Sequence, residues 1–172
     1  MVINAGRLDP EHWTLDPRVG GGRIVGEACH FVDLARFLVA APIVSAQCRR
    51  RDTDGQDGGA FELRFAGGSV AVIDYRTDLP AHLPKERIEV SGPGYAARLE
   101  NWARLRTRGL GGLWRGAPWA RTPQKGHPEA LAAFRRAMAG GGPPIPTAEL
   151  LEVSGWAIRL QAMRADEVVT AP

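Results

Sequence analysis

Apolar residues between positions 24 and 39 recur at intervals of three and four, which is the spacing of one face of an α-helix. Three consecutive glycines, Gly20 to Gly22, open this segment. We therefore predict a helix over residues 24–39 with one face in a hydrophobic core. The residues of that face are Ile24, Ala28, Phe31, Val32, Ala35, Leu38 and Val39.

The opposite face of the same helix mixes polar and apolar residues. At about 100° per residue, a second group of side chains falls roughly together on the far side. A face that met only water would not carry Leu34 and Phe37, so we expect the helix to be covered on both sides, with its polar residues in a cleft or an interface. The group consists of Arg23, Glu27, His30, Asp33, Leu34 and Phe37.

His30 is the residue of this face best suited to proton transfer. The unperturbed pKa of histidine lies nearest to neutrality, and a carboxylate one turn before and one turn after it could orient the ring and tune its basicity. Glu27 and Asp33 have these spacings. A single helical histidine that is merely packed or exposed fits the same pattern.

Alternating apolar and polar residues predict a series of antiparallel strands. In residues 61–65, Phe61, Leu63 and Phe65 alternate with polar residues, and Gly67-Gly68 then predicts a two-residue hairpin turn. This turn would place Phe65 opposite Val70 and Leu63 opposite Val72 on one face. Residues 87–90 and 95–99 form a second alternating pair around Gly92-Pro93-Gly94.

Further elements complete an α+β pattern. Residues 2–6 and 42–51 are expected to be strands, and Pro128 suits the first turn of a helix that ends at a second triple glycine, residues 140–142. Leu131, Phe134 and Met138 share one face of that helix. Thr147 is predicted to cap a last helix. The buried stripe expected for it is Leu150, Val153, Ala157 and Leu160.

Residues 101–125 form the least regular stretch in this interpretation, an excursion within a single domain over residues 1–172. Arginines alternate there with tryptophans, a combination that grips single-stranded nucleic acid. Because no binding motif accompanies them, a basic surface excursion is the favoured interpretation, and we expect no nucleic-acid partner. The residues concerned are Arg104, Arg106, Arg108, Arg115, Arg121, Trp102, Trp114 and Trp119.

The composition is that of an ordinary globular domain. The chain has 172 residues, 44% of them hydrophobic and 24% charged, with a net charge of +3. No apolar run is long enough to span a membrane and no leader pattern is evident, so we expect a cytoplasmic protein without a membrane partner. Cys29 and Cys48 form no disulfide framework and are expected to be reduced and structural.

Several kinds of site lack their motif. Neither glycine cluster has the GxGxxG spacing, since Val25 and Trp114 occupy the third glycine's place, and there is no P-loop. We therefore expect no cofactor to be bound by this chain alone. Glu27 and His30 form a single Glu-x-x-His, without the second copy that a di-metal site needs, so no metal is expected. A GxSxG nucleophile turn is also missing.

Residues 20–33, with the sequence GGGRIVGEACHFVD, resemble the helix entrance of the C-terminal domain of the glucose-fructose oxidoreductase and inositol dehydrogenase (Gfo/Idh/MocA) family. The resemblance is closest to a branch in which this module follows a zinc-type alcohol dehydrogenase module. Similar segments run through nearly the whole chain outside residues 101–122. They are residues 2–6, 12–13, 16–17, 65–70, 84–90 and 125–127.

The resemblance implies an α+β domain with a large, mostly antiparallel open sheet, helices on one face and the other face often used for oligomerisation. In the family this domain holds the substrate pocket and a catalytic histidine, which matches His30 by position. A preceding Rossmann domain binds NAD(P) and supplies a lysine, and neither is found here. The family aspartate four residues before the histidine is replaced by Gly26, so Glu27 can substitute for it only if the helix is irregular there.

The leading hypothesis is the substrate-binding half of an NAD(P)-dependent sugar or polyol oxidoreductase, which forms a homo-oligomer and needs a nucleotide-binding domain or subunit as partner. His30 would be the general acid/base, with Glu27 or Asp33 orienting it. An alternative is a non-catalytic oligomerisation or scaffold module, and a third is a lyase or isomerase that uses His30 without nicotinamide. Candidate substrate contacts are Asn4, His12, Arg23, Lys85 and His127.

Overall fold

The structure, a computed structural model, describes residues 1–51, 55–110 and 122–171. Its contacts divide the chain into two compact units, Met1–Leu83 together with Ala148–Pro172, and Pro84–Thr147. The units are described one by one below. The expectation of a single domain over residues 1–172 stays a prediction.

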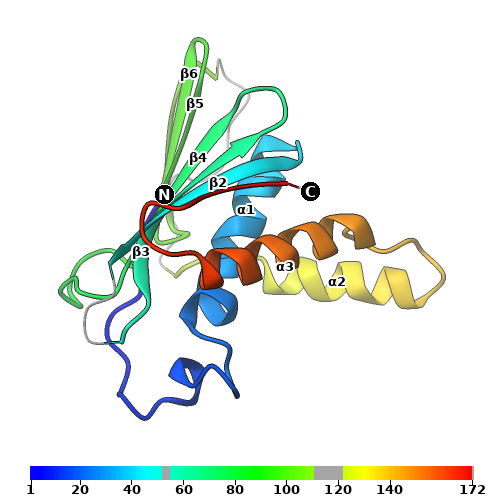
Figure 1. Cartoon of the computed structure of the whole chain (residues 1–172). Helices are drawn as coiled ribbons and strands as arrows, with labels where there is room; N and C mark the ends of the chain where they lie inside the picture. Colours follow the sequence, from blue (N-terminus) through cyan, green and yellow to red (C-terminus); the bar gives the residue numbers. More distant parts are fainter. Residues whose placement is uncertain (52–54, 111–121, 172) are drawn as a thin grey trace. The chain divides into compact units, whose positions relative to one another are not determined.

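The first unit is built on five strands, ordered β1-β4-β3-β2-β8 (Figure 1). Each strand is antiparallel to its neighbour except for β1, which pairs with β4 in parallel. The mostly antiparallel α+β fold predicted from the sequence is thereby confirmed. The elements are β1 (Val2–Asn4), β2 (Ile43–Arg51), β3 (Gly58–Phe65), β4 (Val70–Arg76), β8 (Val168–Thr170), a π-helix (Ile24–Ala28), α1 (Cys29–Val39), a 3-10 helix (Trp13–Leu15) and α3 (Thr147–Ala162).

The core of this unit lies between one face of the sheet and the helices α1 and α3. Because alternate strand residues point to the same side, Phe61 and Leu63 of β3 and Ile73 of β4 are all fully buried against the helices. Val32 of α1 and Leu160 of α3 contribute the helical side of the same cluster. On the other face of the sheet, Val44, Val70 and Val72 are exposed.

The register predicted for the β3–β4 hairpin is wrong by one residue. Leu63 pairs with Ala71 and Arg64 with Val70, and the Phe65 N–H donates to the Ser69 carbonyl at 3.0 Å. The connection therefore contains three residues, Ala66 to Gly68, instead of two. A shift of one residue moves side chains to the opposite face, so Val70 and Val72 lie outside the core.

Two predicted helical faces are also corrected at their ends. Phe37 is 69% and Leu38 41% exposed, so within the described residues the end of α1 is not covered on both sides. In α3 the stripe of Val153, Ala157 and Leu160 is buried as predicted, whereas Leu150 is 46% exposed. Trp156, which the stripe omitted, is buried with them.

The second unit carries a three-stranded antiparallel sheet, β7-β6-β5, made of β5 (Glu86–Gly92), β6 (Tyr95–Glu100) and β7 (Arg104–Arg108). Gly92 pairs with Tyr95, and Gly94 adopts a φ of 80°, so Pro93 and Gly94 form the predicted turn. The interpretation of residues 101–125 as irregular is wrong for Arg104–Arg108, where arginines alternate with Leu105 and Thr107 along a regular strand. Trp114, Arg115, Trp119 and Arg121 lie outside the described residues.

The helix of the second unit is α2 (His127–Met138). Pro128 stands in its first turn as predicted, and Gly126 precedes it with a φ of 73°. Leu131, Phe134 and Met138 share a face as expected and are exposed. Among the described residues, no helix has the length and apolar character required to cross a membrane.

The corrected register can be tested with two neighbouring substitutions in β4. We expect Ile73→Ala to lower the free energy of unfolding by about 2–5 kcal/mol, because it leaves a cavity in the core. Val72→Ala, on the half-exposed face, should cost no more than about 1 kcal/mol. Urea denaturation of both variants measures the difference. Equal losses, or a larger loss for Val72→Ala, would contradict the observed register and support the two-residue turn predicted from the sequence.

Candidate functional site

The entrance to the long helix depends on close backbone packing. A Cβ atom on Gly20 would lie 2.5 Å from the Thr14 Cα, and one on Gly22 would lie 2.5 Å from the Gln161 side-chain amide. Gln161 Oε1 accepts a hydrogen bond from the Ile24 N–H at 3.0 Å. The glycines therefore allow the loop and α3 to approach the first turn, where a side chain also satisfies a free N–H group of the helix.

The helix begins with an irregular turn, the π-helix Ile24–Ala28. The Cys29 N–H donates to the Ile24 carbonyl five residues earlier, which puts one more residue into this turn than an α-helix holds. The sequence required such an irregularity near Gly26 if Glu27 was to replace the family aspartate. The irregularity exists, and the contacts of Glu27 show where it directs that side chain.

Arg23, immediately before the π-helix, is completely buried. Its guanidinium donates to the Gly6 carbonyl at 2.7 Å, to the Ala5 carbonyl at 3.3 Å and to Glu27 Oε2 at 2.8 Å. It also lies 5.5 Å from the centre of the Tyr75 ring. The prediction that Arg23 lies with His30 on the helix face opposite the core is therefore wrong, because an ion pair and two carbonyls hold the Arg23 side chain inside.

Tyr75 of β4 completes this buried cluster. Its hydroxyl donates a hydrogen bond to the same carboxylate oxygen of Glu27. Burial raises the pKa of Tyr75 above its usual value, and the hydrogen bond to Glu27 raises it further. Glu27 thus ties the π-turn to the sheet through two donors, although its side chain keeps 40% of its exposure.

His30 lies in the first turn of α1 with an exposed side chain. Within the described part of the chain, no hydrogen bond or ion pair fixes its ring. Asp33, one turn further on, is partly exposed. An exposed imidazole beside a partly exposed carboxylate can exchange protons with a bound molecule.

The remaining candidates have separate environments. Asn4 at the end of β1 is 7% exposed, and its Nδ2 donates to the Pro80 carbonyl at 2.9 Å while its Oδ1 is buried without a partner. His12 Nδ1 accepts from the Thr14 N–H and so caps the 3-10 helix. Lys85 and His127 are exposed residues of the second unit, and Gly126 occupies the helix-cap position immediately before His127.

Sequence reasoning missed three residues that support the site. Tyr75, Asp57 and Gln161 reach the helix entrance from β4, the β2–β3 connection and α3. Asp57 Oδ2 accepts from the Arg23 N–H at 3.2 Å and from Gln161 Nε2 at 3.1 Å. The alternation of β4 could have placed Tyr75 in the core, whereas the other two depend on contacts between distant parts of the sequence.

Neither cysteine points to a redox or metal site. Both are free, and burial raises the pKa of the Cys29 thiol and of the Cys48 thiol, which favours the protonated, unreactive form. Across residues 1–51, 55–110 and 122–171, no three His, Cys, Asp or Glu side chains are grouped closely enough to hold a metal ion.

Comparison with known proteins identifies the family. The model of the GFO/IDH/MocA C-terminal domain matches residues 2–95, more than half of the chain. The protein therefore belongs to the family of GFO/IDH/MocA C-terminal domains. No curated protein sequence matches it.

Solved structures share the fold at low identity. Aldose-aldose oxidoreductase from Caulobacter crescentus, complexed with glycerol, matches with a TM-score of 0.75 and 18% identity over 99% of this chain and 54% of its own. The WlbA dehydrogenase from Bordetella pertussis, in complex with NADH and UDP-GlcNAcA, matches with a TM-score of 0.68 and 20% identity over 99% of this chain and 54% of its own. A putative myo-inositol dehydrogenase from Sinorhizobium meliloti matches with a TM-score of 0.67 and 19% identity over 98% of this chain and 54% of its own. The chain thus spans about half the length of these relatives.

The buried cluster predicts a loss of stability in alkali. Below pH about 10 both folded and unfolded chains keep the Tyr75 proton; above it only the unfolded state releases the proton, because the folded pKa is raised. The free energy of unfolding should then fall by up to about 1.4 kcal/mol per pH unit. In Tyr75→Phe this decline should shrink, alongside a loss of about 1–3 kcal/mol at neutral pH.

Tyr95 is the matched control, because it is the only other tyrosine of the chain and is 40% exposed. Denaturant unfolding at several pH values, followed together with tyrosinate absorbance, measures both effects. A Tyr75→Phe variant with the alkaline decline of the wild type would show that Tyr75 ionises as easily in the folded state as in the unfolded one.

Proposed function

We propose that this chain is the substrate-binding half of an NAD(P)-dependent sugar or polyol oxidoreductase. Its membership of the family and the full coverage of the chain by dehydrogenase structures support this function. Since the chain corresponds to about half of each relative, the nucleotide-binding domain would lie elsewhere in the protein or on a partner subunit. The motif's likeness to the branch fused to zinc-type alcohol dehydrogenase modules is consistent with such an arrangement.

The observation that carries the proposal is an exposed histidine on a firmly anchored helix. His30 is open to a reactant, while the turn before it is tied to β4 by Glu27 and Tyr75 and to the segment after β1 by Arg23. Catalytic groups gain most when rigid elements hold them in place. The anchoring cluster thus serves the position of His30 and does not itself contact the substrate.

His30 acts as the general acid/base in this proposal. During oxidation of a substrate alcohol its imidazole accepts the hydroxyl proton as the carbon–oxygen double bond forms, and in reduction it returns the proton to the oxygen. NAD(P), bound by the nucleotide-binding domain, supplies the hydride acceptor or donor. Asp33 orients the ring, whereas the contacts of Glu27 with Arg23 and Tyr75 favour a supporting role for that carboxylate.

Substrate contacts and assembly follow from the same proposal. Asn4 is the strongest contact candidate, because its buried Oδ1 has no partner and could accept a hydrogen bond from a sugar hydroxyl. His12, Lys85 and His127 stay weaker candidates, and Arg23 is placed in the anchoring cluster instead. The sheet face that exposes Val44, Val70 and Val72 would serve the proposed homo-oligomer.

Replacing the histidine tests the catalytic assignment. In the assembly that includes the nucleotide-binding domain, His30→Gln should lower kcat by about 10²–10⁴-fold, the usual contribution of a general acid/base. Its free energy of unfolding should change by less than about 0.5 kcal/mol, because the side chain is exposed. His82→Gln, also exposed, is the control and should keep full activity. Unchanged kcat in His30→Gln would favour a scaffold module.

A second test concerns the cofactor. Titration of the isolated chain with NADH or NADPH, followed by nicotinamide fluorescence, should show no saturable binding, and addition of the nucleotide-binding domain should produce it. Saturable binding to the chain alone would contradict the division of labour proposed here, because the chain would then hold a dinucleotide site of its own.

A further inference from the structure

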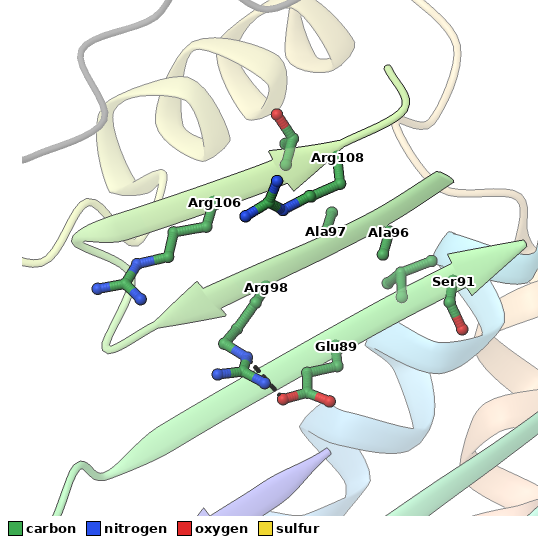
Figure 2. A pocket seen from close by; sticks show the side chains of 9 residues that line it. Glu89, Ser91, Ala96, Ala97, Arg98, Arg106 and Arg108 are labelled. Carbon is green, nitrogen blue, oxygen red and sulfur yellow. Dashed lines mark ion pairs between the residues drawn. The ribbon is translucent and has the colours of Figure 1, made fainter. Parts of the chain in front are cut away.

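The three-stranded sheet of the second unit gathers arginines on one face. Glu89 of β5, Arg98 of β6 and Arg106 of β7 stand directly opposite one another, and the next same-face row is Ser91, Ala96 and Arg108. Residues opposite one another in antiparallel strands point to the same side. Figure 2 shows the Glu89 and Arg98 side chains meeting, with those of Arg106 and Arg108 on the neighbouring strand β7.

The positive charge of this face is only partly neutralised. Glu89 Oε1 lies 2.7 Å from Arg98 Nε and 3.5 Å from Arg87 Nε, whereas Arg106 and Arg108 form no ion pair within the described residues. Successive same-face residues of a strand are about 6.6 Å apart, and neighbouring strands about 4.8 Å, so three guanidinium groups can reach one point. The group of Glu89, Arg98, Arg106 and Arg108 carries a net charge of +2.

A depression lies among these side chains. It has a volume of about 600 Å³, and the described residues that line it belong to β5, β6 and β7. Ser91 and Ala96 of the same face are small, which leaves space between the longer arginine side chains (Figure 2). A volume of this size falls within the range of small-molecule pockets.

We propose that this depression binds the phosphoryl group of a phosphorylated small molecule. Arginine presents paired N–H donors that match phosphate oxygens, and Arg106 and Arg108 are available for this pairing. Arg98 becomes a third donor when the phosphoryl group competes with Glu89, and the Ser91 hydroxyl can donate from the floor. The site is independent of the role proposed for His30.

Titration with inorganic phosphate and with a hexose monophosphate, followed by NMR shifts of the β5–β7 amides, tests the site. Arg106→Gln and Arg108→Gln should each weaken binding of both ligands about tenfold, the equivalent of one charge-assisted hydrogen bond. Arg104→Gln is the matched control, because it removes the same charge from the same face of the same strand outside the depression. It should change binding less than twofold.

In a second pair of variants, the change in phosphate affinity is expected in the opposite direction. Glu89→Gln frees Arg98 and Arg87 and should tighten phosphate binding several-fold. Glu100→Gln removes the same charge from the same face of the sheet, on β6 and outside the depression, and should have little effect. Glu89 is exposed and Glu100 partly exposed, so both variants should fold, which circular dichroism checks. No saturable shift with either ligand would overturn the proposal.

Equal effects of each variant and its control would also overturn it, because they indicate general attraction of anions by the face. A single-stranded oligonucleotide is the comparison ligand. If it binds more tightly than the hexose monophosphate and depends equally on Arg104 and Arg108, the face is a polyanion surface and the phosphoryl site is rejected. Preference for the hexose monophosphate over inorganic phosphate identifies a phosphorylated metabolite as the ligand.

Discussion

The buried guanidinium of Arg23 is the constraint on which the first unit depends. Burying a charged side chain costs several kcal/mol of solvation free energy unless ionic and hydrogen-bonding partners replace the water. Here the replacements come from three places in the sequence: the carbonyls after β1, Glu27 one turn along, and the ring of Tyr75 on β4. Removing Glu27 would leave the buried charge without its counter-charge, and removing another partner would weaken its compensation, so the sheet and the helix entrance are fixed together.

This requirement explains why the helix starts irregularly. A regular α-turn after Arg23 would present Glu27 according to the 100° rotation of an ideal helix. The π-turn, with its bond from Cys29 to Ile24, holds one more residue and delivers the Glu27 carboxylate to Tyr75. From Cys29 onward the helix is regular, so His30 leaves the anchored turn on the outside. The irregularity thus separates an inward-directed carboxylate from an outward-directed imidazole.

The sequence predicted the helices and strands better than it predicted which residues contact one another between them. The alternation of Phe61, Leu63 and Phe65 determined a buried strand, but two glycines fit a two-residue or a three-residue turn, and only packing of Ile73 selects the latter. Arg23 was assigned to the helix face opposite the core because the rotation of a regular helix places it there. Its compensation needs Tyr75, which is distant in sequence.

The position of His30 opposite the core face could be predicted from the sequence, because it depends mainly on local helical position. Apolar residues on either side along the helix, such as Ala28 and Val32, occupy the core and leave His30 facing away from it. What the sequence predicted less well is the surroundings of the ring. Glu27, three residues earlier, is engaged by Arg23 and Tyr75, and this arrangement could not be inferred without the π-turn.

Anchoring and exposure together constrain what His30 can do. A catalytic imidazole must be accessible to its reactant, yet its orientation must be maintained by something stiff. In this chain the cluster of Arg23, Glu27 and Tyr75 holds the turn before His30 in place, and the position of His30 in the first turn of α1 leaves its side chain exposed. Orientation of the ring itself needs a further contact, which Asp33 or a bound substrate can provide.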